Sequence, residues 1–371
     1  MFLKKLTLNN YRNYQSIEIN LDHNINIFIG PNAQGKTNLL EAIYVMALTK
    51  SHRTNTDKEL IGWGSDETTL YCEIEKKYGN NKLEIHLSQK GKKVKVNGLE
   101  QRKLSDFIGV LNVVMFAPED LEIVKGSPKI RRRFIDMELG QVHPSYIYDL
   151  QQYQKILNQR NNLLKQHHSA EDKRLNDLLT IWDQQFVQFG IKIIKKRQHF
   201  IKKLQIWTEQ IHSSITNGKE NLKVIYKPSF EFEQFDDETV LFNQFMLKLT
   251  KMREQEIKRG VTLIGPHRDD LLFLINDKEV QTFGSQGQQR TTALSIKLAE
   301  IELIHEEVGE YPLLLLDDVL SELDQYRQTQ LIETFQDKVQ TFITTTGIES
   351  VNLSKLNEAK LFHVLEGTVT V

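Results

Sequence analysis

The segment from Gly30 to Thr37 constrains the fold more than any other part of the sequence. It reads GPNAQGKT and matches the pattern GxxxxGK followed by Ser or Thr at every fixed position. Apolar residues alternate from Ile17 to Ile29, which predicts two strands, and the segment NLLEAIYVMAL that follows has helical spacing. The motif therefore lies on a strand-to-helix turn, where backbone N–H groups and the positive end of a helix can bind phosphate.

Two residues of this loop carry the specific chemistry. A lysine at the position of Lys36 reaches the β- and γ-phosphate oxygens, and a threonine at the position of Thr37 supplies a hydroxyl ligand to Mg²⁺. A purely structural loop is the alternative, and the flanking strand and helix argue against it. The predicted ATP-binding residues are Gly30, Pro31, Asn32, Ala33, Gln34, Gly35, Lys36 and Thr37.

A second motif supplies the carboxylate that a Mg²⁺ site needs. Residues 313–317 read LLLLD, and four apolar residues that end in an acid are typical of a central parallel strand with its tip at a site. We expect Asp317 to bind Mg²⁺ together with Thr37, and Asp318 to orient or deprotonate the attacking water. The predicted catalytic residues are therefore Lys36, Asp317 and Asp318. The alternative is an acidic strand end that is merely solvated.

Composition limits the class of protein. The 371 residues allow two or three domains, and the 48 Lys and Arg against 49 Asp and Glu give a net charge of -1. No global field therefore attracts nucleic acid or membrane, and any polyanion site must be local. The single Cys72 excludes an intramolecular disulfide and a cysteine-based zinc cluster. Since no apolar run has the length of a membrane span and no signal peptide is visible, we expect a soluble, cytoplasmic protein.

The region between the two motifs changes in character. Alternation from Thr69 to Val96 predicts an antiparallel meander. From Leu175 to Ile211, apolar residues at three-and-four spacing, interrupted only at Arg197, predict a helix of roughly 40 residues. An earlier segment can pack antiparallel to this helix through a polar turn at 167–172, with its apolar residues at Leu150, Tyr153, Leu157 and Leu164.

We therefore predict an α/β fold with a mixed sheet core that is split in sequence by an inserted helical arm. The predicted segments are an N-terminal half of the core at 1–138, the helical arm at 139–258 and a C-terminal half of the core at 259–371. The spacing of apolar residues leaves open whether the helical part projects as an arm or packs as an ordinary subdomain.

A third motif, FGSQGQQR at 283–290, stands just before the acidic strand and is followed by a helical segment. Its Ser-x-Gly sequence resembles the signature loop of ABC-type ATPases, whose serine and helix N-terminus bind the γ-phosphate held by a second subunit. The resemblance implies contacts in trans from Ser285, Gly287 and Gln288. The segment SELD at 321–324 similarly resembles the D-loop of that class, which implies roles for Ser321 and Asp324.

Several segments together resemble the RecF family of bacterial recombination and repair proteins. They are KSHRT at 50–54, FAPEDL at 116–121, VKGSPKIRRRFID at 124–136, GPHRDD at 265–270, FGSQGQQR at 283–290 and LLLDDVLSELD at 314–324. The resemblance covers essentially the full length and is densest in the two ATPase halves. It implies a P-loop ATPase of ABC and SMC type that uses ATP and Mg²⁺.

The same resemblance implies function and partners. A protein of this family is expected to bind DNA in an ATP-dependent way, to form a head-to-tail homodimer on ATP, and to have a weak, DNA-stimulated ATPase activity. It is expected to act on gapped or single-stranded DNA with RecR and RecO, helping to load RecA in support of replication and the SOS response.

Two positions depart from the wider ABC pattern. Asp318 stands where transporter ATPases usually have glutamate, and the strand end Thr344 to Thr346 has no histidine to act as a switch. A shorter base and a neutral phosphate sensor suggest slow hydrolysis, which is typical of a clamp that closes on ATP and opens on hydrolysis. A transporter subunit would need that histidine and glutamate, and a small-molecule kinase would need a substrate lid and no signature loop.

Basic residues gather in two segments that are candidates for DNA contact. Closely spaced lysines and arginines neutralise phosphates without reading bases. The alternatives are a solvated surface and, for the three consecutive arginines, internal salt bridges. The candidate DNA-binding residues are Lys125, Lys129, Arg131, Arg132 and Arg133, and a second run on the long helix comprises Lys192, Lys195, Lys196, Arg197, Lys202 and Lys203.

Other polar loops carry isolated His and Arg residues. The pairs His52–Arg53 and His267–Arg268 lack the three or four closely spaced ligands of a zinc site and are better interpreted as phosphate contacts. Arg12 either approaches the nucleotide or forms a salt bridge at a strand end.

Overall fold

The computed structural model describes residues 1–371 apart from 167–172, 233–234, 236, 321–327, 329–337 and 348–358. The chain forms two compact units. The first contains residues 1–121, 211–219 and 290–371, and the second contains residues 122–210 and 220–289. Within the described ranges, no helix combines the length and the apolar character needed to cross a membrane.

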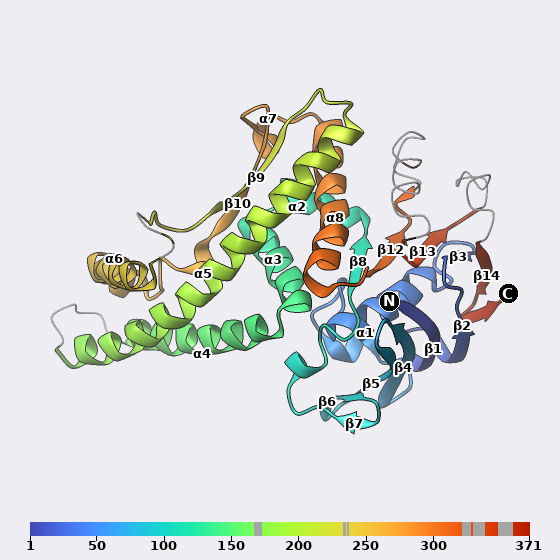
Figure 1. The fold of residues 1–371 in the computed structure, drawn as a ribbon. Coiled ribbons are helices and arrows are strands. Elements are labelled where there is room, and N and C mark those ends of the chain that lie inside the picture. The colour runs from blue at the N-terminus through green and yellow to red at the C-terminus, as the bar shows by residue number, and fades with distance from the viewer. Residues whose placement is uncertain (167–172, 233–234, 236, 321–327, 329–337, 348–358) are drawn as a thin grey trace. The chain divides into compact units, whose positions relative to one another are not determined.

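A six-stranded, largely parallel sheet lies at the centre of the first unit (Figure 1). In spatial order its strands are β15 (Thr368–Thr370), β14 (Lys360–Leu365), β3 (Ile25–Ile29), β13 (Thr341–Thr345), β12 (Leu313–Asp317) and β8 (Val113–Phe116). All neighbours pair in parallel except β14 and β15. The strands β3, β8, β12 and β13 are buried along their whole length, as expected for a parallel sheet with both faces covered.

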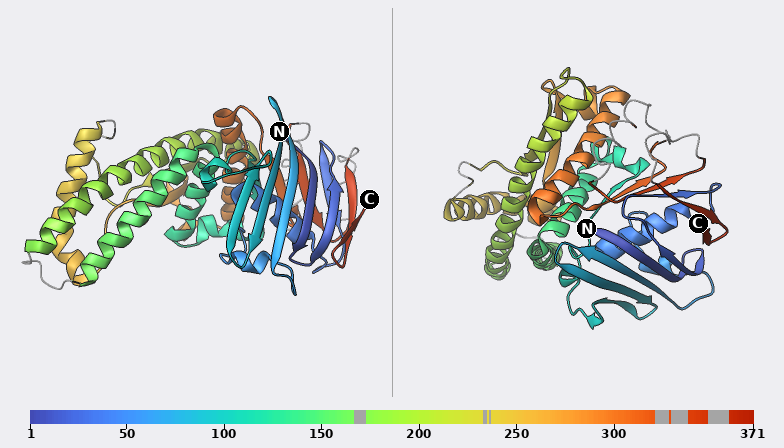
Figure 2. Two further views of the ribbon diagram at one scale, coloured as in Figure 1. Left: turned by 90° about the horizontal axis from the view of Figure 1, so that it is seen from below. Right: turned by 45° about the vertical axis from the view of Figure 1, so that its right-hand side comes forward.

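A second six-stranded sheet of the same unit is antiparallel throughout, and Figure 2 shows its strands lying in a row. Its strands in spatial order are β2 (Tyr14–Asn20), β1 (Phe2–Tyr11), β4 (Glu67–Lys76), β5 (Gly79–Ser88), β6 (Gly91–Val96) and β7 (Leu99–Glu100). Side chains of β4 and β5 alternate between buried and less buried positions, because one face of this sheet covers the core.

Helix α1 (Lys36–Leu48) lies between the two sheets and contacts strands of both. Its side chains are almost all buried, so the helix has no polar face, and it ends at Thr49 in a left-handed conformation. Short 3₁₀ helices complete the unit at η1 (Asp57–Leu60), η2 (Leu104–Asp106) and η3 (Pro118–Asp120).

Helices dominate the second unit. They are α2 (Leu121–Lys125), α3 (Pro128–Val142), α4 (Pro144–Gln166), α5 (Lys173–Ile215), α6 (Glu238–Arg259), η4 (Pro266–Arg268), α7 (Val280–Phe283) and the first turn of α8 (Gln286–Val308). The end of α5, from residue 211, and the rest of α8, from residue 290, belong to the first unit. A three-stranded antiparallel sheet accompanies the helices of the second unit, in the order β11 (Lys278–Glu279), β10 (Asp270–Ile275), β9 (Leu222–Lys227).

Helices α4 and α5 run side by side and antiparallel (Figures 1 and 2). The rings of Tyr153 and Phe186 stack with centroids 4.9 Å apart, and Lys196 of α5 reaches Asp149 of α4 at 2.9 Å. This confirms the predicted helix of roughly 40 residues, which has 43, and its antiparallel partner. The polar turn predicted at 167–172 lies outside the described residues.

Buried arginines join the helices of this unit. Arg160 of α4 has a fully buried guanidinium that binds Asp183 at 2.7 Å, Glu256 at 2.6 Å and the hydroxyl of Thr262 at 2.7 Å. Burial opposes its charge, but the two carboxylates outweigh burial and raise the pKa of Arg160. Because both acids are also buried, each ion of this network depends on the others.

The interruption of the apolar pattern at Arg197 has a structural reason. Its side chain is 2% exposed and donates to the Tyr146 hydroxyl at 3.0 Å, to the Pro266 carbonyl at 2.6 Å and to Asp136 at 2.7 Å. Three segments of the second unit are thus fastened to the middle of α5 by one side chain. The second basic run on the long helix therefore contains at least one residue that serves the fold.

The mixed α/β fold, the strands before Gly30, the meander and the buried strand that ends at Asp317 are all confirmed. The sequence did not reveal the sheet β9–β10–β11. The predicted segments 1–138, 139–258 and 259–371 divide the sequence differently from the two compact units, because 122–138 and 259–289 fall in the second unit.

Replacing Arg160 by Met would leave the carboxylates of Asp183 and Glu256 buried beside an apolar side chain. We expect a loss of about 3–5 kcal/mol in unfolding free energy, seen as a large fall in the thermal unfolding midpoint. The control is Lys195→Met, since the ion pair of Lys195 with Glu238 is 3.7 Å long and largely exposed and should be worth less than about 1 kcal/mol. Equal shifts for the two variants would contradict the assigned role of Arg160.

Candidate nucleotide-binding site

The strand order of the parallel sheet brings together residues that are far apart in sequence. Strand β13 lies between β3 and β12, and all three run in the same direction. Ile29 at the end of β3 pairs with Thr345, and Asp317 at the end of β12 pairs with Thr344. The phosphate motif and the acidic strand tip therefore meet at one edge of the sheet, where open α/β sheets bind ligands.

Two glycines shape the phosphate loop. A Cβ on Gly30 would lie 2.2 Å from the Val364 carbonyl oxygen of β14, so only glycine allows β3 and β14 to approach this closely. Gly35 has φ of +119°, and its missing side chain leaves room for Asn13 and Tyr14. The loop then turns directly into α1, whose first residue is Lys36.

Lys36 is 8% exposed and its ammonium donates to the carbonyls of Gly30 at 2.6 Å and Pro31 at 2.8 Å. Burial lowers its pKa, against the opposing charges of Asp318 and Asp317. Two carbonyl oxygens thus hold the ammonium over the loop, and a phosphate oxygen can replace them.

Asp317 is the junction of the site. Its Oδ1 accepts hydrogen bonds from Thr37 at 2.9 Å and from Thr344 at 2.8 Å. Burial raises its pKa, although both hydroxyls act in the opposite direction. The hydroxyl of Thr37 and the carboxylate of Asp317 are hard oxygen donors of the kind that Mg²⁺ prefers, and they are already adjacent.

Asp318 differs from its neighbour in exposure. Its side chain is exposed, its φ is +55°, and its backbone N–H donates to the Thr344 hydroxyl at 2.9 Å. The Thr344 hydroxyl thus donates its proton to the Asp317 carboxylate and accepts a hydrogen bond from the Asp318 backbone N–H. A non-glycine residue in the left-handed region marks a position where local strain is imposed by the surroundings.

Two turns hold the phosphate loop, and sequence reasoning missed both. From the β1–β2 turn, Asn13 Nδ2 donates to the Gln34 carbonyl at 2.9 Å and the Tyr14 hydroxyl donates to the Gly35 carbonyl at 2.9 Å. From the β14–β15 turn, the Glu366 N–H donates to Gln34 Oε1 at 2.8 Å. No local pattern marks these residues, because only the folded sheet places them beside the loop.

Of the two roles considered for Arg12, nucleotide contact and a salt bridge, the structure shows the salt bridge. Its guanidinium binds Glu41 of α1 through two bonds of 2.9 and 2.7 Å, and Ser51 donates to the same carboxylate at 2.6 Å. Burial acts to raise the pKa of Glu41, but these hydrogen bonds and the charge of Arg12 outweigh it, so the pKa is lowered. Arg53 of the KSHRT segment remains exposed and donates to Asn38 Oδ1 at 2.8 Å.

The predicted signature loop begins α8 in the second unit. Ser285 Oγ accepts from the N–H of Gln288 at 3.2 Å, and Gln288 Oε1 accepts from the N–H of Ser285 at 2.9 Å, which is a capping box. Ser285 and Gly287 are exposed. A Cβ on Gly287 would have only Ser285 Oγ nearby, at 3.9 Å, so its own chain does not require glycine there. Ser321 and Asp324 of the predicted D-loop lie outside the described residues.

Comparison with known proteins decides the family. The chain matches the RecF/RecN/SMC N terminal domain over residues 2–368. It is also 54% identical over 371 residues to the DNA replication and repair protein RecF of Bacillus cereus, covering 100% of this chain and 98% of that protein. The chain belongs to the RecF family.

Solved structures agree with this membership. Two structures of the recombination mediator protein RecF in the RecFOR pathway, one of them RecF-ATP, are 34% and 33% identical to this chain, with TM-scores of 0.92 and 0.91. They cover 99% and 100% of this chain, which covers 97% of each. An Smc head bound to a ScpA domain is 14% identical with a TM-score of 0.55, over 100% of this chain and 96% of that one, and supports the ABC and SMC type of fold alone.

The basic residues between Lys125 and Arg133 differ in how deeply the structure buries them. Arg131 is 3% exposed and binds Asp270 through bonds of 2.6 and 2.9 Å, so its charge is already used. Arg132 is half-buried and donates to the Asp269 carbonyl at 2.8 Å, and burial lowers its pKa. The exposed members of the segment are Lys125, Lys129 and Arg133.

The segment GPHRDD of this RecF-family chain also serves the second unit. Asp269 accepts from the Ser229 N–H at 2.7 Å and from the Tyr226 hydroxyl. His267 Nδ1 lies 2.7 Å from the Tyr153 hydroxyl, and burial lowers its pKa to about 4, so the ring is neutral at pH 7. Arg268 is exposed and donates to the Thr262 carbonyl at 3.1 Å.

Gly30→Ala tests the close approach of the phosphate loop to β14. The added Cβ forces Val364 away, and we expect a lower thermal unfolding midpoint that corresponds to about 1–3 kcal/mol. Gly287→Ala is the matched control, because its Cβ meets open space at the start of a helix and should leave the midpoint unchanged or slightly higher. If Gly30→Ala unfolded at the wild-type midpoint, the assigned packing would be wrong.

Proposed function

We propose that this chain is an ATP-dependent DNA-binding protein of recombinational repair that works as an ATP-closed homodimer. One observation carries the proposal, namely the hydrogen bond that joins Thr37 to Asp317 beside a complete phosphate loop. It assembles an ATPase site from two ends of the sequence, in a chain that belongs to the RecF family.

The loop fits the phosphates of ATP. In a loop of this type the backbone N–H groups and the N-terminus of the following helix bind an anion, and Lys36 would exchange its carbonyl partners for phosphate oxygens. Thr37 and Asp317 would hold Mg²⁺, which neutralises the phosphate charge when bound. Asp318, exposed and fixed through its N–H by Thr344, orients the attacking water.

Hydrolysis in such a site is slow. Aspartate at position 318 has a shorter side chain than the glutamate of transporter ATPases, and Thr344 and Thr345 at the end of β13 are neutral. ATP binding therefore has time to hold a closed state, and hydrolysis sets the time of release.

The signature helix supports a site shared between two copies. Ser285 and Gly287 are exposed at the N-terminus of α8, and the space above Gly287 is open. An N-terminus of this kind binds an anion presented from outside, such as the γ-phosphate held by a second copy. We assign Ser285, Gly287 and Gln288 to that contact in trans, with Ser321 and Asp324 in the D-loop role.

DNA and partner proteins complete the proposal. The exposed Lys125, Lys129 and Arg133 are the candidates for sequence-independent phosphate contacts. The relatives are named for DNA replication and repair and for recombination mediation in the RecFOR pathway. We therefore propose that the closed dimer binds gapped or single-stranded DNA and assists RecR and RecO in loading RecA, with DNA stimulating a weak ATPase.

Two variants separate nucleotide binding from dimerisation. Lys36→Ala should abolish ATP binding and, with it, the ATP-induced dimer, because it removes the charge that meets the phosphates. Ser285→Arg should leave ATP binding by the monomer intact and block the dimer, because it obstructs the exposed helix N-terminus. Nucleotide binding by fluorescence and mass by sedimentation, with and without gapped DNA, report the two steps. A Ser285→Arg protein that still dimerises on ATP would contradict the contact in trans.

Charge reversal distinguishes surface from structural arginines. The triple variant Lys125→Glu, Lys129→Glu and Arg133→Glu should weaken DNA binding by at least about tenfold and reduce its salt dependence, with the fold retained. Arg131→Glu should instead lower the thermal unfolding midpoint, since it places an acid against Asp270. Unchanged DNA affinity and salt slope in the triple variant would remove this surface from the proposal.

A further inference from the structure

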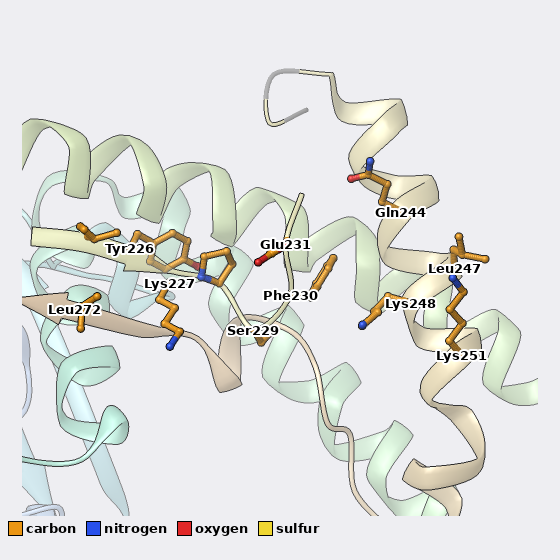
Figure 3. A pocket seen from close by; sticks show the side chains of 12 residues that line it. Tyr226, Lys227, Ser229, Phe230, Glu231, Gln244, Leu247, Lys248, Lys251 and Leu272 are labelled. Carbon is orange, nitrogen blue, oxygen red and sulfur yellow. The ribbon is translucent and has the colours of Figure 1, made fainter. Parts of the chain in front are cut away.

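A hollow of about 660 Å³ lies in the second unit, and none of the residues that line it belongs to the nucleotide site. Figure 3 shows the strand ends of β9 and β10, the loop at 228–231 and helix α6 around it, with Lys248 extending from α6 toward the loop that carries Phe230. We call it the α6 groove. Its lining includes Ile225, Lys227, Leu247, Lys248, Lys251 and Leu272.

Large apolar side chains are left in solvent along this groove. Leu247 is 56% exposed and Ile225 is 41% exposed. Neither side chain belongs to the buried face of its own element. Strand β9 buries Val224 and Tyr226 instead. Helix α6 buries Leu241, Phe245 and Leu249. An exposed apolar patch beside a hollow, rimmed by charge, is typical of a surface that receives another molecule.

The charges of the groove are unbalanced. Among the described residues, none forms an ion pair with Lys227, Lys248 or Lys251, whereas other lysines of this unit are neutralised, such as Lys223 by Asp277 at 2.6 Å. Glu231 is the one acid among the lining residues that the structure describes. The described lining therefore carries three lysines and one carboxylate beside exposed apolar side chains, which favours an occupant with negative charge.

The first half of the free edge of β9 is already occupied. Gln205 of α5 donates to the Leu222 carbonyl at 3.1 Å and accepts from the Val224 N–H, so its amide takes up two outward backbone groups of the strand. An added strand could not pair along that half, and the side chains that line the hollow are the contacts on which the proposal rests.

We propose that the α6 groove docks an acidic segment of a partner protein, with carboxylates on Lys227, Lys248 and Lys251 and an apolar side chain against Ile225 and Leu247. Nucleic acid fits less well. A phosphate backbone makes no use of exposed leucine and isoleucine. The two aromatic rings of the described lining, Tyr226 and Phe230, are only 7% and 8% exposed and present no open stacking face.

The full chain is tested with defined probes. A fluorescein-labelled peptide that alternates Glu with Leu and Phe should bind wild type, measured by fluorescence anisotropy. A peptide with Ser in place of Leu and Phe, and one with Lys in place of Glu, should each bind at least about tenfold more weakly. Absence of binding by the first peptide, or equal binding of all three, would overturn the proposal.

Variants locate the binding. The double variant Lys248→Glu, Lys251→Glu should bind the acidic peptide with an affinity at least about tenfold lower than wild type. Leu247→Ser should lower the affinity several-fold. Lys202→Glu, an exposed charge on α5 outside the groove, is the matched control and should bind as wild type. All variants should bind ATP as wild type does, which verifies that they are folded.

A labelled oligothymidylate decides between the two classes of macromolecule. Its affinity should be unchanged in the Lys248→Glu and Lys251→Glu double variant. If the oligonucleotide lost affinity in that variant while the acidic peptide kept it, the groove would be a nucleic-acid site and the proposal would be wrong. None of these outcomes depends on the nucleotide site, so they are independent of the proposed ATPase function.

Discussion

The carboxylate of Asp317 is the interaction on which the first unit depends. It accepts hydrogen bonds from Thr37, in the first turn of α1, and from Thr344, near the end of the neighbouring strand β13. Three segments from positions 37, 317 and 344 are thereby held at one point, and each contributes the polar atom that the others need in a buried place. The same hydrogen bond places a carboxylate and a hydroxyl side by side at the phosphate loop, and this is the pair that we propose to hold Mg²⁺.

The second unit is organised by a different kind of interaction. Buried arginines at 160 and 197 connect helices and loops through ion pairs inside an otherwise apolar interior. This arrangement explains two motifs that suggest DNA or phosphate contact at first sight. Arg131 of the RRR run and Asp270 of GPHRDD bind each other, and Asp269 is enclosed by Ser229 and Tyr226. Charges in a recognisable motif can therefore serve the fold, and burial is what separates the two uses.

Local signals explain what the sequence could predict. The phosphate loop, the strand that ends at Asp317, the meander and α5 each follow from a pattern within one continuous segment. The contacts of Asn13 and Glu366 with the phosphate loop could not be predicted, because they depend on which strands become neighbours. The strand β9 was missed for a similar reason, since its six residues stand between two helical patterns and pair only with β10.

The pairing of β3 has a consequence for biosynthesis. Its two neighbours in the parallel sheet, β13 and β14, come from residues 341–365, more than three hundred positions later. A ribosome therefore releases the phosphate loop long before the strands that flank it exist. During that interval the apolar strand at 25–29 has two bare edges, which is the state in which nascent chains aggregate or recruit chaperones. The parallel sheet around the phosphate loop is thus completed only when translation has reached the C-terminal strands.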